Sequence, residues 1–204
     1  QILYSLPGRR IVRRVVKTAV RSDKPESVVF AVGDRPENDA VVEWCERAGA
    51  PYHQGPEDDL LARHLATAEA FDADPVVRVT GDCPFIPPGE INRIVREHGE
   101  NDARYTTNFA EGMPIGTAVD AINRDVLSDL RECGDTHPVR RLREHPEEWD
   151  VAVSPAERWT ELAPAHTAVD TPEDYWTLTD AVAAVGEDPQ AVTEWVAEHA
   201  KGSR

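Results

Sequence analysis

The stretch Pro75–Pro88, which reads PVVRVTGDCPFIPP, decides the fold of this chain. Its run of β-branched residues predicts a strand, and Gly81–Pro84 (GDCP) ends that strand abruptly. An apolar strand of this kind is typical of the interior of a parallel sheet. Open α/β sheets bind their ligands just beyond the carboxyl ends of such strands. Asp82 occupies that position and is the first candidate for a functional group.

Helical and extended patterns alternate on both sides of this strand. Further strands are expected at residues 27–32, 51–53, 104–108, 117–122, 150–154 and 165–169. Helices are expected at residues 9–21, 59–71, 123–132, 136–145, 171–185 and 189–200, with two more that end at Gly49 and begin after Pro88. This alternation predicts an α/β fold with a mostly parallel, doubly wound sheet. Since no repeat or linker interrupts it, we expect a single domain over residues 1–204.

The charge of the chain is strongly acidic. It contains 38 Asp and Glu against 22 Lys and Arg, a formal net charge of −16, and only three of the basic residues are lysines. Such a surface repels phosphate backbones, which argues against nucleic-acid binding. An acidic, lysine-poor surface also favours a halophilic protein, because salt screens the self-repulsion.

Cysteine content and hydropathy exclude several further classes. Three widely separated cysteines without a CxxC pair predict neither a disulfide framework nor a zinc site, which fits a reducing cytoplasm. No apolar run approaches a membrane span and no secretory signal opens the chain, so we expect a cytoplasmic protein without membrane contact. The absence of GxSxG, Walker and GxGxxG motifs argues against serine hydrolases, P-loop enzymes and dinucleotide oxidoreductases.

A second candidate carboxylate lies in Val169–Asp174, which reads VDTPED. Thr171 suits a helix N-cap and Asp174 a capping box, so Asp170 alone lacks a structural explanation. If the two strand ends lie close together, Asp82 and Asp170 converge at one rim. Such a pair suits Mg²⁺, which binds through one or two carboxylates together with waters and substrate phosphates.

Arg78, the segment Gly55–Arg63 and the histidines give weaker evidence about the functional site. Arg78 interrupts an apolar strand, and a buried guanidinium needs either an ion-pair partner or a phosphate or base contact. Gly55–Arg63 (GPEDDLLAR) places a loop before a helix N-terminus, which suits polar ligand groups. Because Arg63 follows Asp59 by four residues, we expect a helical salt bridge between them. Without ligand spacing, three histidines are expected to be structural: His64, His137 and His166.

With these motifs the chain resembles the cytidylyltransferases that activate acidic sugars. The most similar branch is that of spore-coat polysaccharide synthesis, related to the enzymes that make CMP-KDO and CMP-sialic acid. Three blocks carry the resemblance: Val76–Pro84 (VVRVTGDCP), Gly55–Arg63 and Val169–Asp174. In weaker form, Tyr105–Asn108 and Thr136–Val139 resemble segments near the family's sugar site.

The resemblance implies a three-layer α/β/α fold of the nucleotide-diphospho-sugar-transferase type, with a mostly parallel mixed sheet. It implies Mg²⁺-dependent transfer of CMP from CTP to an acidic or related sugar, with pyrophosphate release, in surface polysaccharide or glycan biosynthesis. By the same resemblance Asp82 and Asp170 are the catalytic, metal-binding residues. Nucleotide contacts are then expected from Arg78, Gly81, Asp59 and Arg63, and sugar contacts from Asn108, Asp120 and His137.

The chain departs from the family in two places. The family opens with a strand and a Gly/Arg/Ser-rich loop that grips the triphosphate, and this chain begins at Gln1 just after that loop, so we expect upstream residues. Where the family reads PDGLDVE, Pro114–Asp120 reads PIGTAVD. Family enzymes dimerise through the region of residues 100–145, which implies a homodimer. The alternatives are a glycosyltransferase, a molybdenum-cofactor-type nucleotidyltransferase, and a degenerate non-catalytic subunit.

Overall fold

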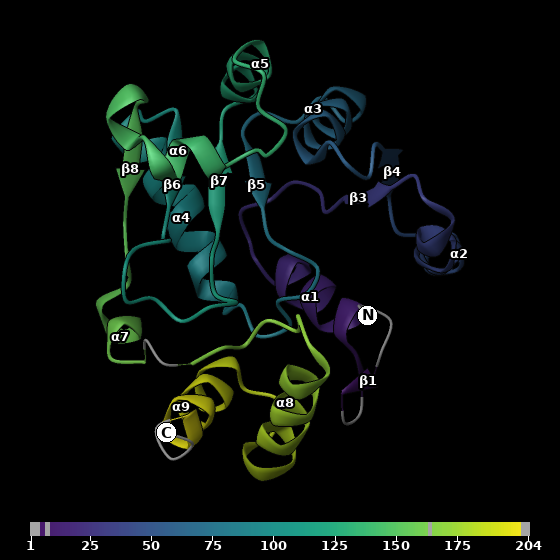
Figure 1. Cartoon of the computed structure of the whole chain (residues 1–204), viewed down its shortest axis with the longest axis vertical. Helices are drawn as coiled ribbons and strands as arrows, with labels where there is room; N and C mark the ends of the chain where they lie inside the picture. Colours follow the sequence, from purple (N-terminus) through teal and green to yellow (C-terminus); the bar gives the residue numbers. More distant parts are fainter. Residues whose placement is uncertain (1–4, 7–8, 163–164, 201–204) are drawn as a thin grey trace.

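The computed structural model describes residues 5–6, 9–162 and 165–200 (Figure 1). The helices are α1 Ile11–Val20, α2 Asp39–Ala48, α3 Leu60–Ala70, α4 Pro88–Asn101, α5 Arg124–Glu132, α6 Arg140–Glu144, α7 Glu157–Thr160, α8 Pro172–Val185 and α9 Pro189–Ala200. The strands are β1 Ser5–Leu6, β2 Arg9–Arg10, β3 Phe30–Gly33, β4 Tyr52–Gly55, β5 Val76–Arg78, β6 Tyr105–Thr107, β7 Asp120–Ile122 and β8 Val151–Val153. Short 3-10 turns lie at Pro36–Asn38 and Pro146–Glu148.

The main sheet has four strands in the order β5-β7-β6-β8, and β3 and β4 form a separate parallel pair. β6 and β8 are parallel, whereas β7 is antiparallel to both β5 and β6. Residues Val77, Ala121, Thr106 and Ala152 face one another across the four strands. The predicted α/β architecture with a mixed sheet is therefore confirmed, and its antiparallel pairing is concentrated on β7.

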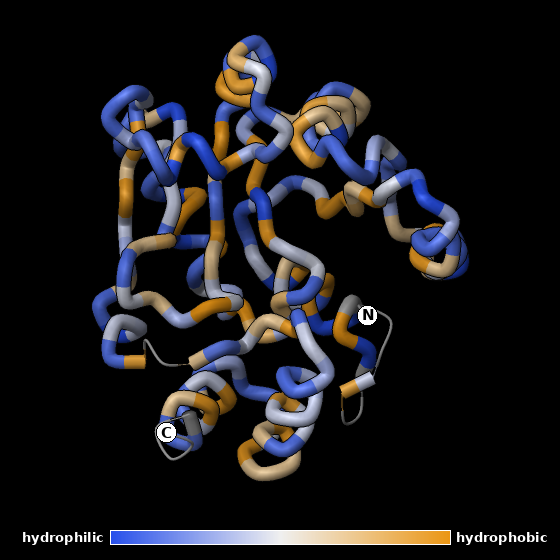
Figure 2. The backbone as a smooth tube through the Cα atoms, viewed as in Figure 1, coloured by the Kyte–Doolittle hydropathy of each residue, from blue (hydrophilic) through white to orange (hydrophobic). Residues whose placement is uncertain are grey.

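Helices cover the strands and bury a core in several connected clusters. α3 and α5 lie at one end of the main sheet in Figure 1, and α8 and α9 lie together at the other. One cluster surrounds the end of β5 and includes Cys83, Ile86, Ile94, Val119 and Ala121. Hydrophobic stretches run along β7 and within α8 (Figure 2). This packing fixes the residues that follow β5 against the rest of the domain.

Helix ends follow their local sequence closely. α2 ends at Gly49, whose φ of 63° is left-handed. α8 begins with a capping box, in which Thr171 and Asp174 exchange side-chain and backbone hydrogen bonds. The expected salt bridge between Arg63 and Asp59 is wrong. The Asp59 carboxylate caps α3 by accepting from the backbone N–H of Ala62 at 2.8 Å, and this contact orients it towards the helix end.

Two predicted elements differ in the structure. Residues 165–169 do not form a strand, because their backbone bonds go to two separate partners, Ile115 and Asp82, and leave one isolated bridge at His166. The helix predicted at 136–145 begins only at Arg140. His137 precedes a proline, which disfavours the helical conformation, and its Nδ1 instead accepts from backbone N–H groups.

In the described part of the chain, none of the helices combines the length and the apolar character that crossing a bilayer requires.

Candidate active site

The site begins at the turn that follows β5. Cys83 N–H donates to the carbonyl of Thr80 at 3.2 Å, and the Thr80 hydroxyl lies 2.8 Å from the Cys83 sulfur. That thiol donates to Oδ1 of Asp82 at 3.3 Å. Burial and the adjacent Asp82 carboxylate raise the pKa of Cys83 to about 12, so the sulfur keeps its proton. Cys83 therefore orients the half-buried carboxylate of Asp82 at the rim of the sheet.

A second segment reaches this turn from the far end of the chain. Val169 N–H donates to the main-chain carbonyl of Asp82 at 3.0 Å. Val169 is buried, and the next residue, Asp170, is exposed. Asp82 and Asp170 thus lie on two hydrogen-bonded segments at one rim of the protein.

Two further side chains surround Asp170. Nε2 of His166 lies 3.0 Å from Oδ2 of Asp170. Asp174 accepts from the backbone N–H groups of Asp170 and Thr171 at 3.1 and 2.7 Å. Burial disfavours the charged form of Asp174, but the hydrogen bonds from Thr171 and the nearby His166 outweigh it and lower its pKa. Donor atoms of His166, Asp170 and Asp174 all lie within 4.8 Å of one another.

This donor set fits a divalent cation. Oxygen ligands suit Mg²⁺ and Mn²⁺, and the exposure of Asp170 leaves room for waters and substrate phosphates. A second group with comparable donor spacing is His145, Glu147 and Glu148, which is fully exposed at the turn after α6. Only the first group adjoins the segment that contacts Asp82.

Arg78 and Asp120 form a charged cluster beneath the sheet rim. Arg78 Nη1 lies 3.1 Å from Oδ2 of Asp120, so the ion-pair alternative for this arginine is the one present. Asp120 also accepts from Arg143 at 2.7 Å, from the Tyr105 hydroxyl at 2.7 Å and from the Thr107 hydroxyl at 2.8 Å. Burial disfavours ionisation of Asp120, but Arg143 and Arg78 outweigh it and lower its pKa.

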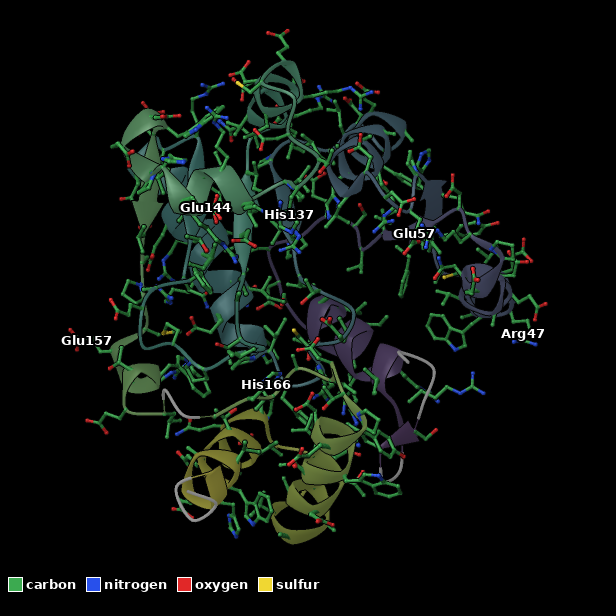
Figure 3. The ribbon with its side chains drawn as sticks, viewed as in Figure 1. Arg47, Glu57, His137, Glu144, Glu157 and His166 are labelled. Carbon is green, nitrogen blue, oxygen red and sulfur yellow. The ribbon has the colours of Figure 1, made fainter. Side chains whose placement is uncertain are left out.

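Two histidines lie close to this cluster. Burial, followed by the nearby charge of Arg78, lowers the pKa of His64 and of His137 to about 4. Both rings are therefore neutral at neutral pH. Figure 3 shows His137 near β5 and α6, well apart from His166 on the segment above α8 and α9.

The remaining predicted site residues lie in different parts of the structure, and some are exposed while others are buried. Gly81 is exposed at the turn beside Asp82. Asp59 and Arg63 lie on the loop and helix after β4, where Arg63 pairs with Glu57 at 3.7 Å. Asn108 is fully buried; it donates to the carbonyl of Thr117 and accepts from the backbone N–H of Val119. The structure thus brings the segments of Gly81–Asp82 and Asp170 together through a main-chain hydrogen bond. Asp59 caps α3 and Arg63 lies within that helix, whereas Asn108 and Asp120 are buried.

Three residues of the site have roles that our sequence reasoning missed. Cys83 orients Asp82, Asp174 fixes the backbone of Asp170, and His166 contacts the Asp170 carboxylate. The regular four-residue spacing of His166, Asp170 and Asp174 is visible in the sequence and could have indicated the last two contacts.

Acidic side chains beyond the carboxyl end of a strand in an α/β fold mark a common position for a ligand or metal site, but they do not by themselves identify an enzyme class. The sequence model of the family described as "Cytidylyltransferase" matches residues 2–157, well over half of the chain. The chain therefore belongs to the cytidylyltransferase family, and the predicted family and enzyme class are confirmed.

Similarity to individual proteins supports the same assignment. The chain is 25% identical over 185 residues to the spore coat polysaccharide biosynthesis protein SpsF of Bacillus subtilis, covering 88% of this chain and 76% of that protein. Three further curated relatives are matched over 51%, 50% and 49% of their own length, so the chain spans about half of each.

Two solved structures show the fold. A cytidylyltransferase from Leptospira borgpetersenii superposes with a TM-score of 0.86 at 22% identity, covering 98% of this chain and 88% of that one. A CMP:2-keto-3-deoxy-manno-octonic acid synthetase solved in complex with CTP superposes with a TM-score of 0.66 at 14% identity, covering 90% and 91%. The predicted nucleotidyltransferase type of fold is confirmed.

Proposed function

We propose that this cytidylyltransferase transfers CMP from CTP to an acidic or related sugar, with release of pyrophosphate, in surface polysaccharide or glycan biosynthesis. The observation that supports the proposal is the main-chain hydrogen bond from Val169 N–H to the carbonyl of Asp82, which joins the segments that carry Asp82 and Asp170. An oxygen of the sugar attacks the α-phosphate in line, and pyrophosphate leaves.

Asp82 and Asp170 would hold the Mg²⁺ ion that this reaction needs. When bound, the ion neutralises charge on the phosphates and favours deprotonation of the attacking oxygen. Cys83 keeps the Asp82 carboxylate oriented, and Asp174 holds the backbone of Asp170. Gly81 is exposed beside Asp82, and we retain Gly81, Asp59, Arg63 and Arg78 as proposed nucleotide contacts.

The charge balance beneath the rim supports an acidic substrate. Arg78 and Arg143 share one carboxylate, Asp120, so the three groups together carry one net positive charge. The ring of His137 adds none, because its pKa is lowered to about 4 by burial and Arg78. In a chain with a net charge of −16, such a cluster is a favourable place for the anionic group of a sugar. We propose that Asn108 and Asp120 shape this sugar site from below and that His137 lies at its edge.

Three properties of the protein remain proposals. We propose a homodimer that forms through the region of residues 100–145, a cytoplasmic location, and adaptation to high salt. The acidic composition supports the last of these, since salt screens repulsion among like charges. Light scattering of the full-length protein at several salt concentrations tests the first.

Pyrophosphate release by the full-length protein tests the proposed activity. The enzyme is incubated with CTP, UTP, GTP or ATP, each with a panel of acidic and neutral sugars, and pyrophosphate is measured. We expect release that needs CTP, an acidic sugar and a divalent cation together. Release that prefers GTP would favour a molybdenum-cofactor-type enzyme. Turnover of a nucleotide sugar without pyrophosphate would show a glycosyltransferase, and binding of CTP without any turnover a non-catalytic subunit.

A further inference from the structure

The segment 165–170, which connects α7 to α8, is held at both ends. Near its start, Ile115 N–H donates to the carbonyl of Ala165 at 3.1 Å, and Thr167 N–H donates to that of Ile115 at 2.8 Å. Near its end, Val169 N–H donates to the carbonyl of Asp82. Because these bonds lie on either side of His166 and just before Asp170, the backbone that carries both side chains is fixed.

Close packing against Gly116 holds the same segment from one side. Gly116 has a φ of +95°, and a Cβ atom there would lie 2.5 Å from the backbone nitrogen of Ala168. Thr167 and Ala168 are buried on this side, whereas His166 and Asp170 reach solvent. The segment therefore presents an imidazole and a carboxylate at the surface next to Asp82.

The spacing of these donors matches the coordination sphere of one metal ion. In an octahedral site with bonds of about 2.1 Å, neighbouring ligand atoms lie about 3 Å apart. Nε2 of His166 and Oδ2 of Asp170 form a hydrogen bond of 3.0 Å, so a cation could replace the shared proton with little movement of either atom. One carboxylate oxygen of Asp174 accepts from the backbone N–H groups of Asp170 and Thr171, so Asp174 holds the backbone of Asp170 in place. A cation between the imidazole and Asp170 would lie beside the segment that contacts Asp82.

We propose that His166 is a third protein ligand of the metal site formed by Asp82 and Asp170. The inference rests on the proposed function and adds a nitrogen donor to it. Imidazole is a poor ligand for Mg²⁺ and a good one for transition-metal ions, so the site binds Mn²⁺ more tightly than Mg²⁺. The preference for Mn²⁺ is therefore stronger than two carboxylates alone would give.

Nitrogen coupling on bound Mn²⁺ tests this directly. The full-length protein is titrated with Mn²⁺ alone, free Mn²⁺ is followed by electron paramagnetic resonance, and the bound ion is examined by electron spin echo envelope modulation. We expect a ¹⁴N coupling in the wild type that His166→Gln abolishes, with a loss of Mn²⁺ affinity of at least about tenfold. The matched control is His145→Gln in the other His/Glu group, which should leave the coupling and the affinity unchanged.

Failure of this inference differs from failure of the proposed function. A wild-type spectrum without nitrogen coupling, or with a coupling that persists in a folded His166→Gln variant, overturns the ligand assignment whatever the activity. If Asp82→Asn abolishes pyrophosphate release while His166→Gln leaves Mn²⁺ binding intact, the function stands and the inference falls. Thermal melting of each variant shows whether it is folded, and His166→Asn replaces His166→Gln if the latter is not.

Discussion

Replacing Asp120 with asparagine tests the charged cluster beneath the rim. The substitution keeps the size of the side chain and one acceptor oxygen but removes its charge. Asp120 is fully buried, and Arg143 and Arg78 lie 2.7 and 3.1 Å from its carboxylate oxygens. Without that carboxylate, two guanidinium groups that are largely buried lose their anionic partner. We therefore expect a large loss of stability.

The magnitude follows from the burial of the pair. Removing one partner of a buried ion pair costs about 3–5 kcal/mol, and the remaining amide oxygen favours the lower value, about 3 kcal/mol. For a chain of this size each kcal/mol lowers Tm by about 2–4 °C, so the variant should melt roughly 6–12 °C below the wild type. The matched control is Asp72→Asn. Asp72 pairs with Arg124 at 3.0 Å but is 94% exposed, and such a pair contributes about 0–1 kcal/mol.

Urea unfolding at several pH values measures both the size and the sign of the effect. Arg143 and Arg78 lower the pKa of Asp120 in the folded state despite its burial. Its contribution is therefore present above the unfolded pKa, about 3.9, and lost as the pH falls through the lower folded value. The difference between the wild type and Asp120→Asn should be constant from pH 7 to about 5 and shrink below about 4. A cost under about 1 kcal/mol, or one no larger than that of Asp72→Asn, would refute the reasoning.

Three further predictions concern Gly116, His64 and the surface charge. Gly116→Ala adds a Cβ atom 2.5 Å from the backbone nitrogen of Ala168 at a left-handed position, so it should lower the free energy of unfolding in urea by about 2–3 kcal/mol. Its control is Gly49→Ala, which is also left-handed but has open space around it and should cost only about 1 kcal/mol. Equal losses would contradict the packing argument. In the folded state the pKa of His64 is lowered to about 4, so the neutral ring contributes to folding stability above its unfolded pKa near 6.5, and this contribution is lost as the pH falls to 4. His64→Gln should therefore flatten the pH dependence of stability between pH 6.5 and 4. An unchanged slope would exclude this role. Raising NaCl from 0.1 to 1 M shortens the screening length from about 10 to about 3 Å, so Tm should rise, whereas a constant Tm would argue against salt adaptation.

The sequence predicted the elements whose determinants are local. The glycine after α2 and the capping residues of α8 act within a few positions of the helix ends, and both ends are found where expected. The strand before Gly81 is also present, but β5 ends at Arg78, so the expectation that it runs up to Gly81 is wrong. The position of Asp82 beyond β5 follows from the same local pattern.

Contacts between distant segments could not be predicted in the same way. Arg78 and Asp120 are 42 residues apart, and the sequence shows only that a buried arginine needs a partner. The apolar segment before Asp170 resembles a strand, yet its hydrogen bonds are divided between Ile115 and Asp82. Arg63 pairs with Glu57, and not with Asp59 one helical turn away, because the helix end uses that carboxylate. In each case several residues could have supplied the hydrogen-bond or ion-pair partner, and only the folded structure shows which one does.

The central claim is that Asp82 and Asp170 act together as one site. The most direct measurement compares CTP-dependent pyrophosphate release by the full-length wild type, Asp82→Asn, Asp170→Asn and the double variant, with melting curves to confirm folding. Residues that act as a unit lose activity non-additively. We predict that each single variant is folded and nearly inactive and that the double variant is no worse than either. Near-normal activity of a single variant, or losses that multiply in the double variant, would contradict the claim.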